Sequence, residues 1–509
     1  MSPSEVIVPA LLFLALAGCA TSSVDMAPRR PDRPWVPRTR SGGAIVPGAP
    51  PAVDSGANGY VLPFNPALAT VPDPLALDQR HEYSLAELID IAQSNNPLTR
   101  KAWNDARGVA LAAGIAKSAF LPTLTASVVA AYQNLNNNGT PAGLSLNGIN
   151  NGEGVIPALS IQWLLFDFGE RSAVLHAAEE GSVIANVGFT AAHQQVIHAV
   201  SLAYYAHVAA RAHLSTAGRS LTNAQAVQVA AEEHYAHGVG TVVEVAQARQ
   251  ATAQAQLLRV QAEAGVQDAY QGLIGAMGIS PLTRITVANI ADRELPAAVT
   301  DSIDRIVAEA LGRRPDVVAA YAARRASEEQ VRAARAELFP KLFVSATGAY
   351  NSGQLNVTSL PGFGNQSPTT NLTANHFNFT VVAGVTVPIY DGGLRLAMLE
   401  QAQAKADNAA LALTHAREEA VHEIVVAQNG LRTALSAHEA STLLVSAAQT
   451  TFDAALAAYR NGVGSITVAT TAETQLLQAE NAETDSYSAA LSTAATLALA
   501  VGGLGSAPR

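Results

Sequence analysis

The sequence predicts a mainly α-helical protein that also supplies strands to a membrane β-barrel, and three observations support this fold class. Two stretches of about 65 residues without proline would each form a helix about 100 Å long. Segments in which apolar and polar residues alternate, as they do in β-strands, precede both stretches. The second half of the chain repeats special residues of the first half in the same order, which indicates a tandem duplication.

Composition excludes several classes of protein. Of the 509 residues, 49% are hydrophobic and only 14% are charged, whereas ordinary soluble domains have roughly 25% charged residues. The net charge of −10 argues against binding to nucleic acid, which requires a basic surface. A single cysteine excludes a disulfide framework and a zinc cluster. No run of 18 apolar residues follows the N-terminus, which excludes a polytopic helical membrane protein.

The N-terminus resembles a bacterial lipoprotein signal. Residues 6–18 are apolar and lead into Leu16-Ala17-Gly18-Cys19, which resembles a lipobox. We therefore expect residues 1–18 to be a signal peptide and Cys19 to carry palmitate or another acyl chain; Ala20 resembles the sorting choice for the outer membrane. The alternative is a lone buried cysteine in a core strand. The first residues contain Glu5 but no Lys or Arg, which leaves the true start codon open.

Residues 19–83 are expected to form a lipid-anchored, proline-rich tether. A lipid chain alone is a modest anchor, so another part of the protein must also hold it in the membrane. Eleven prolines between residues 28 and 74 favour an extended chain and exclude helix and sheet interior. They are Pro28, Pro31, Pro34, Pro37, Pro47, Pro50, Pro51, Pro63, Pro66, Pro72 and Pro74.

From residue 84 onward the chain repeats itself at two shifts, which differ by an insertion in one polar loop. The first shift, of 218 residues (302 − 84), superimposes Ser84, Pro97, Arg107, Pro122, Leu124 and Tyr132 on Ser302, Pro315, Arg325, Pro340, Leu342 and Tyr350. The second shift, of 224 residues (391 − 167), superimposes Asp167, Gly169, Arg171, Tyr235, Gly238, Gly240 and Gly278 on Asp391, Gly393, Arg395, Tyr459, Gly462, Gly464 and Gly502. We expect a first structural repeat at 84–280, a linker at 281–300, a second repeat at 301–502 and a short tail at 503–509.

Each repeat is expected to begin with a helix. Ser84 and Glu87 have the spacing of a capping box and would open a helix that runs toward residue 118. In the second repeat Asp301 is the expected cap. Pro122 and Pro340 end these helices because proline lacks a backbone N–H and clashes with the preceding turn.

Two alternating strands follow in each repeat. The first strands run from Leu124 to Tyr132, with Thr123, Thr125 and Ser127 on the opposite face, and from Leu342 to Tyr350. After polar loops at 134–154 and 351–376, the second strands carry Leu159, Ile161, Trp163 and Leu165, or Phe377, Phe379, Val381, Ala383, Val385 and Val387. Strands of about ten residues with one apolar face suit a tilted membrane crossing. The alternative is an ordinary soluble sheet.

The strand-to-helix junctions lead into the two long helices. Asp167, Gly169 and Arg171 mark the first junction, and Asp391, Gly393 and Arg395 mark the second; Asp can cap the coming helix, while Gly permits the bend. Each long helix ends at a glycine turn, residues 238–240 or 462–464, where the chain reverses.

The apolar residues of the two returning helices have coiled-coil spacing, which predicts that the helical hairpins supercoil with a left-handed twist. The stripe consists of Val245, Ala248, Thr252, Ala255, Arg259, Ala262, Val266, Ala269, Leu273 and Ala276 in the first repeat, and of Ala469, Ala472, Leu476, Ala479, Ala490, Thr493, Leu497 and Ala500 in the second.

One chain alone cannot form a membrane barrel. Four strands would leave two open edges in lipid, where unpaired backbone groups are not tolerated. Two copies would give eight strands whose interior nearly fills with side chains, while three copies would give twelve strands around a lumen. The polar face of Thr123, Thr125 and Ser127 favours the wider assembly.

The ordered set of these motifs resembles the TolC-like outer-membrane efflux proteins, over about residues 84–502. The signature residues are Pro97 with Pro122, the Asp-x-Gly-x-Arg strand exit, and Tyr-x-x-Gly-x-x-Ser/Thr at the helical turn. The lipobox makes the chain most similar to the lipoprotein branch. The resemblance implies a homotrimer whose 12-stranded β-barrel in outer-membrane lipid is continuous with an α-helical barrel in the periplasm. It also implies an exit duct for drugs, metals or other toxic compounds.

The resemblance implies further partners and a gate. The partners are a periplasmic adaptor (a membrane fusion protein) and an inner-membrane pump, for which the RND type is favoured and the ABC type is the alternative. The expected adaptor surface is the tip, farthest from the strands, with Tyr235, Gly238, Gly240, Tyr459, Gly462 and Gly464. The family closes its tips with polar contacts and an acidic constriction, and Glu244 and Glu473 are the gate candidates here. Threonines replace the usual aspartate near the second turn, and Glu473 is alternatively a solvated charge.

Other functions find less support. His193 with His198 and His234 with His237 suggest a metal site, but solvated surface histidines explain them better. The chain lacks a phosphate-binding G-x-x-x-x-G-K-S/T motif and any catalytic constellation, so we expect a protein that is not an enzyme and needs no cofactor. Two alternatives stay open: the outer-membrane component of a type I protein secretion system, and a structural coiled-coil envelope lipoprotein.

Overall fold

The computed structural model describes residues 31–32, 38–40, 44–46, 62, 64–134, 151–289, 295, 303–350 and 377–505. The expected signal peptide, Cys19 and Asp301 lie outside these residues, as do most of the two strand loops. The chain divides into two compact units, Met1–Leu75 and Ala76–Arg509.

The described residues of the first unit form three short elements. Strand β1 (Arg38–Thr39) pairs antiparallel with β2 (Ile45–Val46), and η2 (Pro66–Leu68) is a 3₁₀ turn capped by Asn65. The expectation that the proline-rich tract contains no helix is wrong at η2. Pro66 occupies the start of this turn, where its missing N–H would have no partner in any case.

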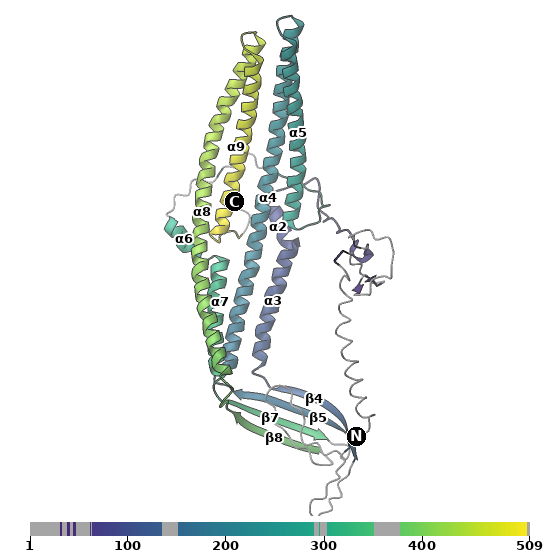
Figure 1. Cartoon of the computed structure of the whole chain (residues 1–509), viewed down its shortest axis with the longest axis vertical. Coiled ribbons are helices and arrows are strands. Elements are labelled where there is room, and N and C mark those ends of the chain that lie inside the picture. Colours follow the sequence, from purple (N-terminus) through teal and green to yellow (C-terminus); the bar gives the residue numbers. More distant parts are fainter. Residues whose placement is uncertain are drawn as a thin grey trace, which may run out of the picture. The chain divides into compact units, whose positions relative to one another are not determined.

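The second unit contains both repeats (Figure 1). The first repeat comprises β3 (Glu82–Tyr83), α2 (Leu85–Asn95), α3 (Pro97–Ser118), β4 (Thr123–Asn134), β5 (Asn151–Phe166), α4 (Glu170–Ala236), α5 (Val242–Met277) and β6 (Thr286–Val287). The second comprises α6 (Ile303–Leu311), α7 (Pro315–Ala336), β7 (Lys341–Tyr350), β8 (Phe377–Thr386), α8 (Leu394–Arg460) and α9 (Ile466–Ala500).

The helix expected from Ser84 toward residue 118 is in fact two helices, α2 and α3. The capping box is confirmed, since Ser84 accepts from the N–H of Glu87 and the Glu87 carboxylate accepts from the N–H of Ser84. Pro97 then forces the preceding residue out of the helical conformation, and Asn96 becomes the N-cap of α3 through a 2.9 Å bond from the N–H of Leu98.

The four long strands form one antiparallel sheet in the order β4-β5-β7-β8. All four expected strands are confirmed, but β5 begins at Asn151, inside the expected loop. The reason is its partner: β4 continues to Asn134, and the two strands stay paired up to Asn134 opposite Asn151. A register shift between Leu164 and Phe166 loosens the ladder where β5 leaves the sheet.

Helices α4 and α8 confirm the expected proline-free rods, with 67 residues each. Helices α5 and α9 pack back along them, and the predicted coiled-coil stripes face these contacts. Val245, Ala248, Ala255 and Leu273 are buried in α5, as are Ala469, Ala472, Leu476 and Ala479 in α9. Among the described residues, no helix combines the length and hydropathy needed to cross a membrane.

The largest apolar core lies where α2, α4 and the ends of α5 and α9 meet. It includes Leu88, Tyr204, Leu273 and Met277. Gly278 and Gly502 end α5 and α9 in the left-handed conformation, at φ 71° and 68°.

The N-caps of α3 and α7 bind the two returning helices in the same way. Asn96 donates to the carbonyl of Ala276 at 3.4 Å, and Arg314 donates to the carbonyl of Ala500 at 2.8 Å. The duplication thus preserves a contact although its side chain has changed.

Candidate functional site

The sheet presents one apolar and one polar face. Leu124, Ile161, Ala346 and Val381 form a row across the four strands. The next row, on the opposite face, consists of Thr125, Ser160, Thr347 and Thr380. Such two-sided alternation is typical of strands that separate lipid from a polar lumen.

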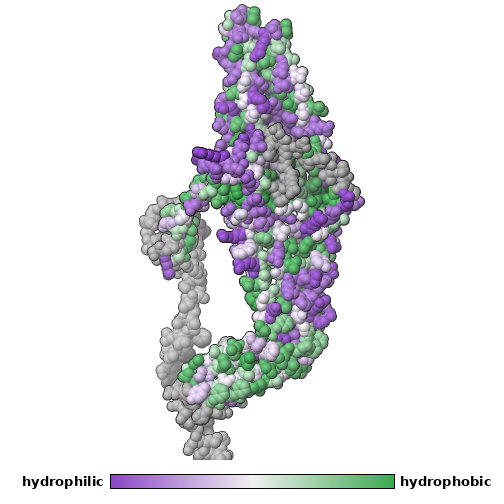
Figure 2. Space-filling view, turned by 180° about the vertical axis from the view of Figure 1, so that it is seen from behind, coloured by the Kyte–Doolittle hydropathy of each residue, from purple (hydrophilic) through white to green (hydrophobic). Residues whose placement is uncertain are grey.

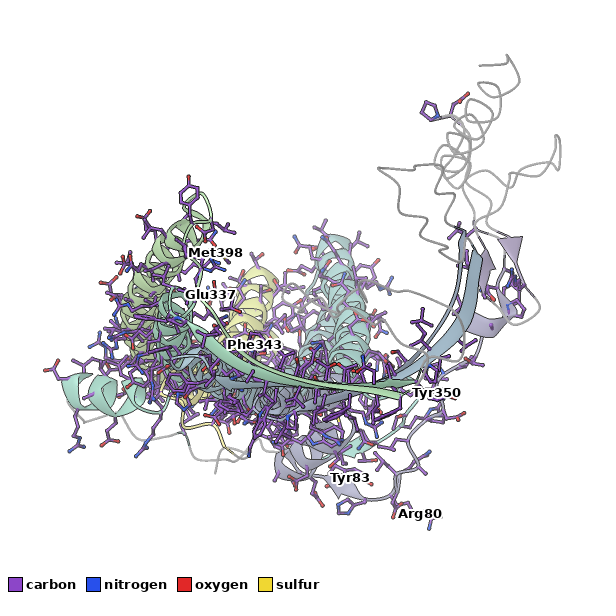
Figure 3. All side chains as sticks on the ribbon, turned by 90° about the horizontal axis from the view of Figure 1, so that it is seen from below. Arg80, Tyr83, Glu337, Phe343, Tyr350 and Met398 are labelled. Atoms are coloured by element: carbon purple, nitrogen blue, oxygen red, sulfur yellow. The ribbon has the colours of Figure 1, made fainter. Side chains whose placement is uncertain are left out.

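The apolar face and both sheet edges are uncovered in the described part of the single chain. Hydrophobic residues gather over the sheet, while the helices carry more hydrophilic ones (Figure 2). Exposed apolar side chains include Leu124, Val128, Leu159, Trp163, Phe379, Val381 and Val385. Strand β4 pairs only with β5, and β8 only with β7, among the described residues. Phe343 lies near the start of β7 and Tyr350 at its end, and the two labels show how the strand runs along this curved sheet (Figure 3).

At the first strand-to-helix junction, Asp167 and Arg171 are buried and hydrogen-bonded to each other and to the backbone. Asp167 accepts from the backbone N–H groups of Gly169 and Arg171 and from Nε of Arg171 at 2.7 Å. The Arg171 guanidinium also donates to the carbonyls of Ala119 at 3.0 Å and Leu164 at 2.6 Å, which joins α3, β5 and α4. Gly169, at φ 92°, makes the bend that the sequence predicts, and it is the N-cap of α4.

Sequence analysis missed Phe168, which completes this junction. It has a positive φ of 51°, uncommon for a bulky residue. Its ring stacks on Phe339 at 5.3 Å and contacts Phe166 edge-on at 4.8 Å. Its counterpart in the second repeat is Gly392, so the duplication gave no signal for this contact.

The second junction has the same local pattern but is more open. Asp391 accepts from the N–H of Gly393 and from Nη1 of Arg395 at 2.9 Å. Both side chains remain partly exposed, and within the described residues Arg395 is tied only to Asp391. The adjoining Ile389 and Tyr390 are almost fully exposed.

The glycine turns form tight reversals at the ends of the long helices. Gly238 and Gly462 have φ values of 75° and 72°. A Cβ on Gly240 or Gly464 would lie 2.9 or 3.0 Å from the preceding helical turn, so only glycine fits without a shift. Val239 and Val463, between the glycines, are 76% and 82% exposed. Each turn therefore offers a protruding apolar side chain in addition to backbone.

The two tips touch each other through the first turn's histidine. The ring of His234 lies 4.9 Å from that of Tyr459, which is buried, whereas Tyr235 is exposed. Burial and the charge of Glu244 raise the pKa of Tyr459. The Glu244 carboxylate accepts from the N–H of Thr241 at 2.8 Å, so this gate candidate also caps α5. His234 keeps intermediate exposure to solvent, and its ring also packs on Tyr459.

Glu473 lies in the seam between α4 and α9, which joins the two helical hairpins. It is only 9% exposed and accepts from the Ser220 hydroxyl at 2.5 Å. Burial raises the pKa of Glu473. The hydrogen bond from Ser220 lowers that pKa, whereas the charge of Glu480 raises it further. The alternative of a solvated surface charge is therefore wrong.

The seam between α4 and α9 also contains three further polar contacts, which were not predicted from the sequence. Arg219 pairs with Glu480 at 3.1 Å, His213 contacts Asp485 at 2.9 Å, and His198 contacts Thr496 at 3.1 Å. Burial lowers the pKa of His198, which is thus not a solvated histidine. The described residues contain no group of three metal-ligating side chains.

Comparisons with known proteins agree with the duplicated geometry. A model of the outer membrane efflux protein family matches residues 88–279 and 306–503, one segment in each repeat. Protein CyaE of Bordetella pertussis is 28% identical over 85% of this chain and 86% of its own length. Outer membrane protein OprJ of Pseudomonas aeruginosa is 24% identical over 74% of this chain and 75% of its own.

Solved structures have the same fold. The outer membrane protein VceC from Vibrio cholerae superimposes with a TM-score of 0.68 at 23% identity, covering 82% of this chain and 96% of that one. A membrane protein from Pseudomonas aeruginosa gives a TM-score of 0.70 at 23% identity, with 82% and 90% covered.

Proposed function

The chain belongs to the outer membrane efflux protein family, and from this premise we propose that three copies form the exit duct of a tripartite efflux system. An inner-membrane pump and a periplasmic adaptor would deliver drugs, metals or other toxic compounds to it, and the duct would release them outside the cell. The chain itself would act as a channel and carry out no catalysis.

The observation that carries this proposal is the open, two-faced sheet continuous with rods of about 100 Å. The apolar row through Leu124 and Val381 would face lipid, and the polar row through Thr125 and Thr380 would line a wet lumen. Three copies would supply twelve strands, enough for an open lumen, and would leave no free edge. A coiled-coil spacer between envelope layers would need no such sheet.

The tips are the proposed adaptor surface. Val239 and Val463 protrude beside backbone groups at the ends of both hairpins, where an adaptor made of helices could pack. Glu244 and the His234–Tyr459 contact lie directly behind these turns, so docking there could move the hairpins that close the duct. We also propose that Cys19 carries the acyl chain that anchors the protein in the membrane.

Two measurements test the function. The purified protein in planar bilayers is expected to form discrete ion-conducting channels, which a coiled-coil spacer would not do. Cells that lack the protein should accumulate a fluorescent efflux dye and recover on complementation. Normal dye export combined with loss of a secreted protein would instead support the type I secretion system.

A further inference from the structure

A pocket of about 760 Å³ lies beside α4, far from both the strands and the glycine turns. Its walls are α4, the second half of α5 and the segment 281–287 that follows α5. Helix α5 ends about midway along α4 (Figure 1). His207, which lines the pocket, lies 37 residues (207 − 170) from the start of α4, which corresponds to about 55 Å. The volume is in the range of pockets that bind small organic molecules.

Hydrogen bonds hold the segment after α5 in place. The hydroxyl of Tyr270 on α5 donates to the carbonyl of Thr283 at 3.1 Å and accepts from the N–H of Ile285 at 2.9 Å. Nη1 of Arg211 on α4 donates to the carbonyl of Val287 at 3.0 Å, and β6 pairs with β3. The walls of the pocket are therefore fixed by the fold.

The charged side chains that line the pocket are two arginines, Arg211 and Arg284. This is unexpected in a chain with 41 acidic and 31 basic residues. Arg284 is exposed and has no hydrogen bond or ion pair with another described residue. Gln267 and Gln271 add amide donors, while Glu82, which β3 places beside β6, does not line the pocket. Several donors without a carboxylate favour a negatively charged ligand.

The duplicates of the polar side chains in this pocket are apolar. At the shift of 224 residues, His207, Arg211, Gln267, Tyr270 and Gln271 correspond to Leu431, Leu435, Leu491, Ala494 and Ala495. All five duplicates pack in or against the hydrophobic clusters of the core. The helical hairpin therefore packs at this level without polar groups, so packing alone does not explain them in the first repeat.

His207 is the buried member of this set. Its side chain is on a residue only 4% exposed, and its Nδ1 has no hydrogen-bond partner among the described residues. Buried polar atoms nearly always have a partner. A polar group that the chain itself does not supply would complete the surroundings of this ring.

We propose that this pocket binds a small organic anion whose carboxylate or phosphate group accepts hydrogen bonds from Arg211 and Arg284. Arginine suits both acid groups, because its planar guanidinium donates two parallel hydrogen bonds to either of them. The apolar body of the ligand packs against Leu214, Val266 and Leu282, which line the same pocket. The site belongs to the flank of the first hairpin, and it uses neither the sheet nor the glycine turns.

Isothermal titration calorimetry with the full-length protein in nanodiscs tests the site. The probes are phenyl phosphate, phenylacetate and, as a neutral analogue, benzyl alcohol. At least one of the two anions should bind at one site per chain, whereas benzyl alcohol should not; tighter binding of phenyl phosphate would indicate a phosphate ligand, and tighter binding of phenylacetate a carboxylate ligand. Equal binding of benzyl alcohol, or no saturable binding of either anion at millimolar concentration, would overturn the proposal.

Variants locate the binding in this pocket. Arg284→Gln should weaken it about tenfold or more, because hydrogen bonds to a charged group are lost. At the exposed position 271, Gln271→Glu should abolish binding of the anion, whereas Gln271→Lys should strengthen it. Arg249→Gln removes an exposed arginine elsewhere on α5 and should bind like the wild type. Unchanged affinity in both Arg284→Gln and Gln271→Glu would overturn the assignment of the anion to this pocket.

Discussion

Arg171→Ala is expected to destabilise the protein far more than Arg395→Ala, although the two arginines are duplicates. The Asp167 and Arg171 side chains are 7% and 11% exposed, so the substitution leaves a buried carboxylate without its cationic partner. It also removes the donor to the carbonyls of Ala119, at the end of α3, and Leu164, near the end of β5. Breaking a buried pair in this way costs about 3–5 kcal/mol. Asp391 and Arg395 are 27% and 28% exposed, and water screens such a pair, so its loss should cost about 0–1 kcal/mol.

Thermal unfolding of the detergent-solubilised protein, followed by far-ultraviolet circular dichroism, measures this difference. At roughly 2–4 °C per kcal/mol, Arg171→Ala should lower the Tm by roughly 6–20 °C and Arg395→Ala by no more than about 4 °C. Adding Asp167→Asn to Arg171→Ala should recover part of the loss, because the uncompensated charge is removed. Equal Tm shifts for the two arginine variants, or no recovery in the double variant, would refute the argument.

The same junction predicts a pH dependence. Burial would raise the pKa of Asp167, but the hydrogen bonds and charge of Arg171 outweigh it and hold that pKa below its ordinary 3.8. A lowered folded pKa stabilises the protein above the unfolded pKa, and this contribution is lost as pH falls through the folded value. The gap in Tm between the wild type and Arg171→Ala should therefore narrow below about pH 4.

Four further predictions concern the tips, the seam and the anchor. Glu244→Gln should raise resting conductance in single-channel recordings while helix content stays unchanged, because glutamine keeps the capping box and removes only the charge. Burial raises the pKa of Glu473, so the stabilisation that this group contributes is present at acid pH and is lost as pH rises through the folded pKa. Glu473→Gln should therefore make the Tm less dependent on pH above about pH 4.5. An unchanged dependence of the Tm on pH would contradict this. Gly240→Pro or Gly464→Pro removes the N–H that bonds to His234 or Ala458 and should abolish dye efflux without preventing membrane insertion, whereas normal efflux in both variants would exclude the tips as the adaptor surface. Cys19→Ser should lose incorporation of labelled palmitate yet still fold, and continued labelling would place the lipid elsewhere.

The sequence by itself determined the elements whose signals are local or periodic. Alternation located the four strands, absence of proline gave the two 67-residue helices, and the glycine turns appear where their spacing placed them. The duplication helped because each motif could be checked against its copy. Local chemistry missed only details, such as the break at Asn96 and the longer β5.

Only the tertiary structure decided which side chains share an environment. Ser220 and Glu473 are 253 residues apart, and no local pattern distinguishes a glutamate buried in a helical seam from one in water. Asp167 and Asp391 have the same motif, yet one is buried and the other partly exposed, because the packing of α3, β5 and α7 around the first junction is not repeated around the second. Periodicity fixes which face of a helix or strand is apolar, but burial depends on the neighbour that covers that face.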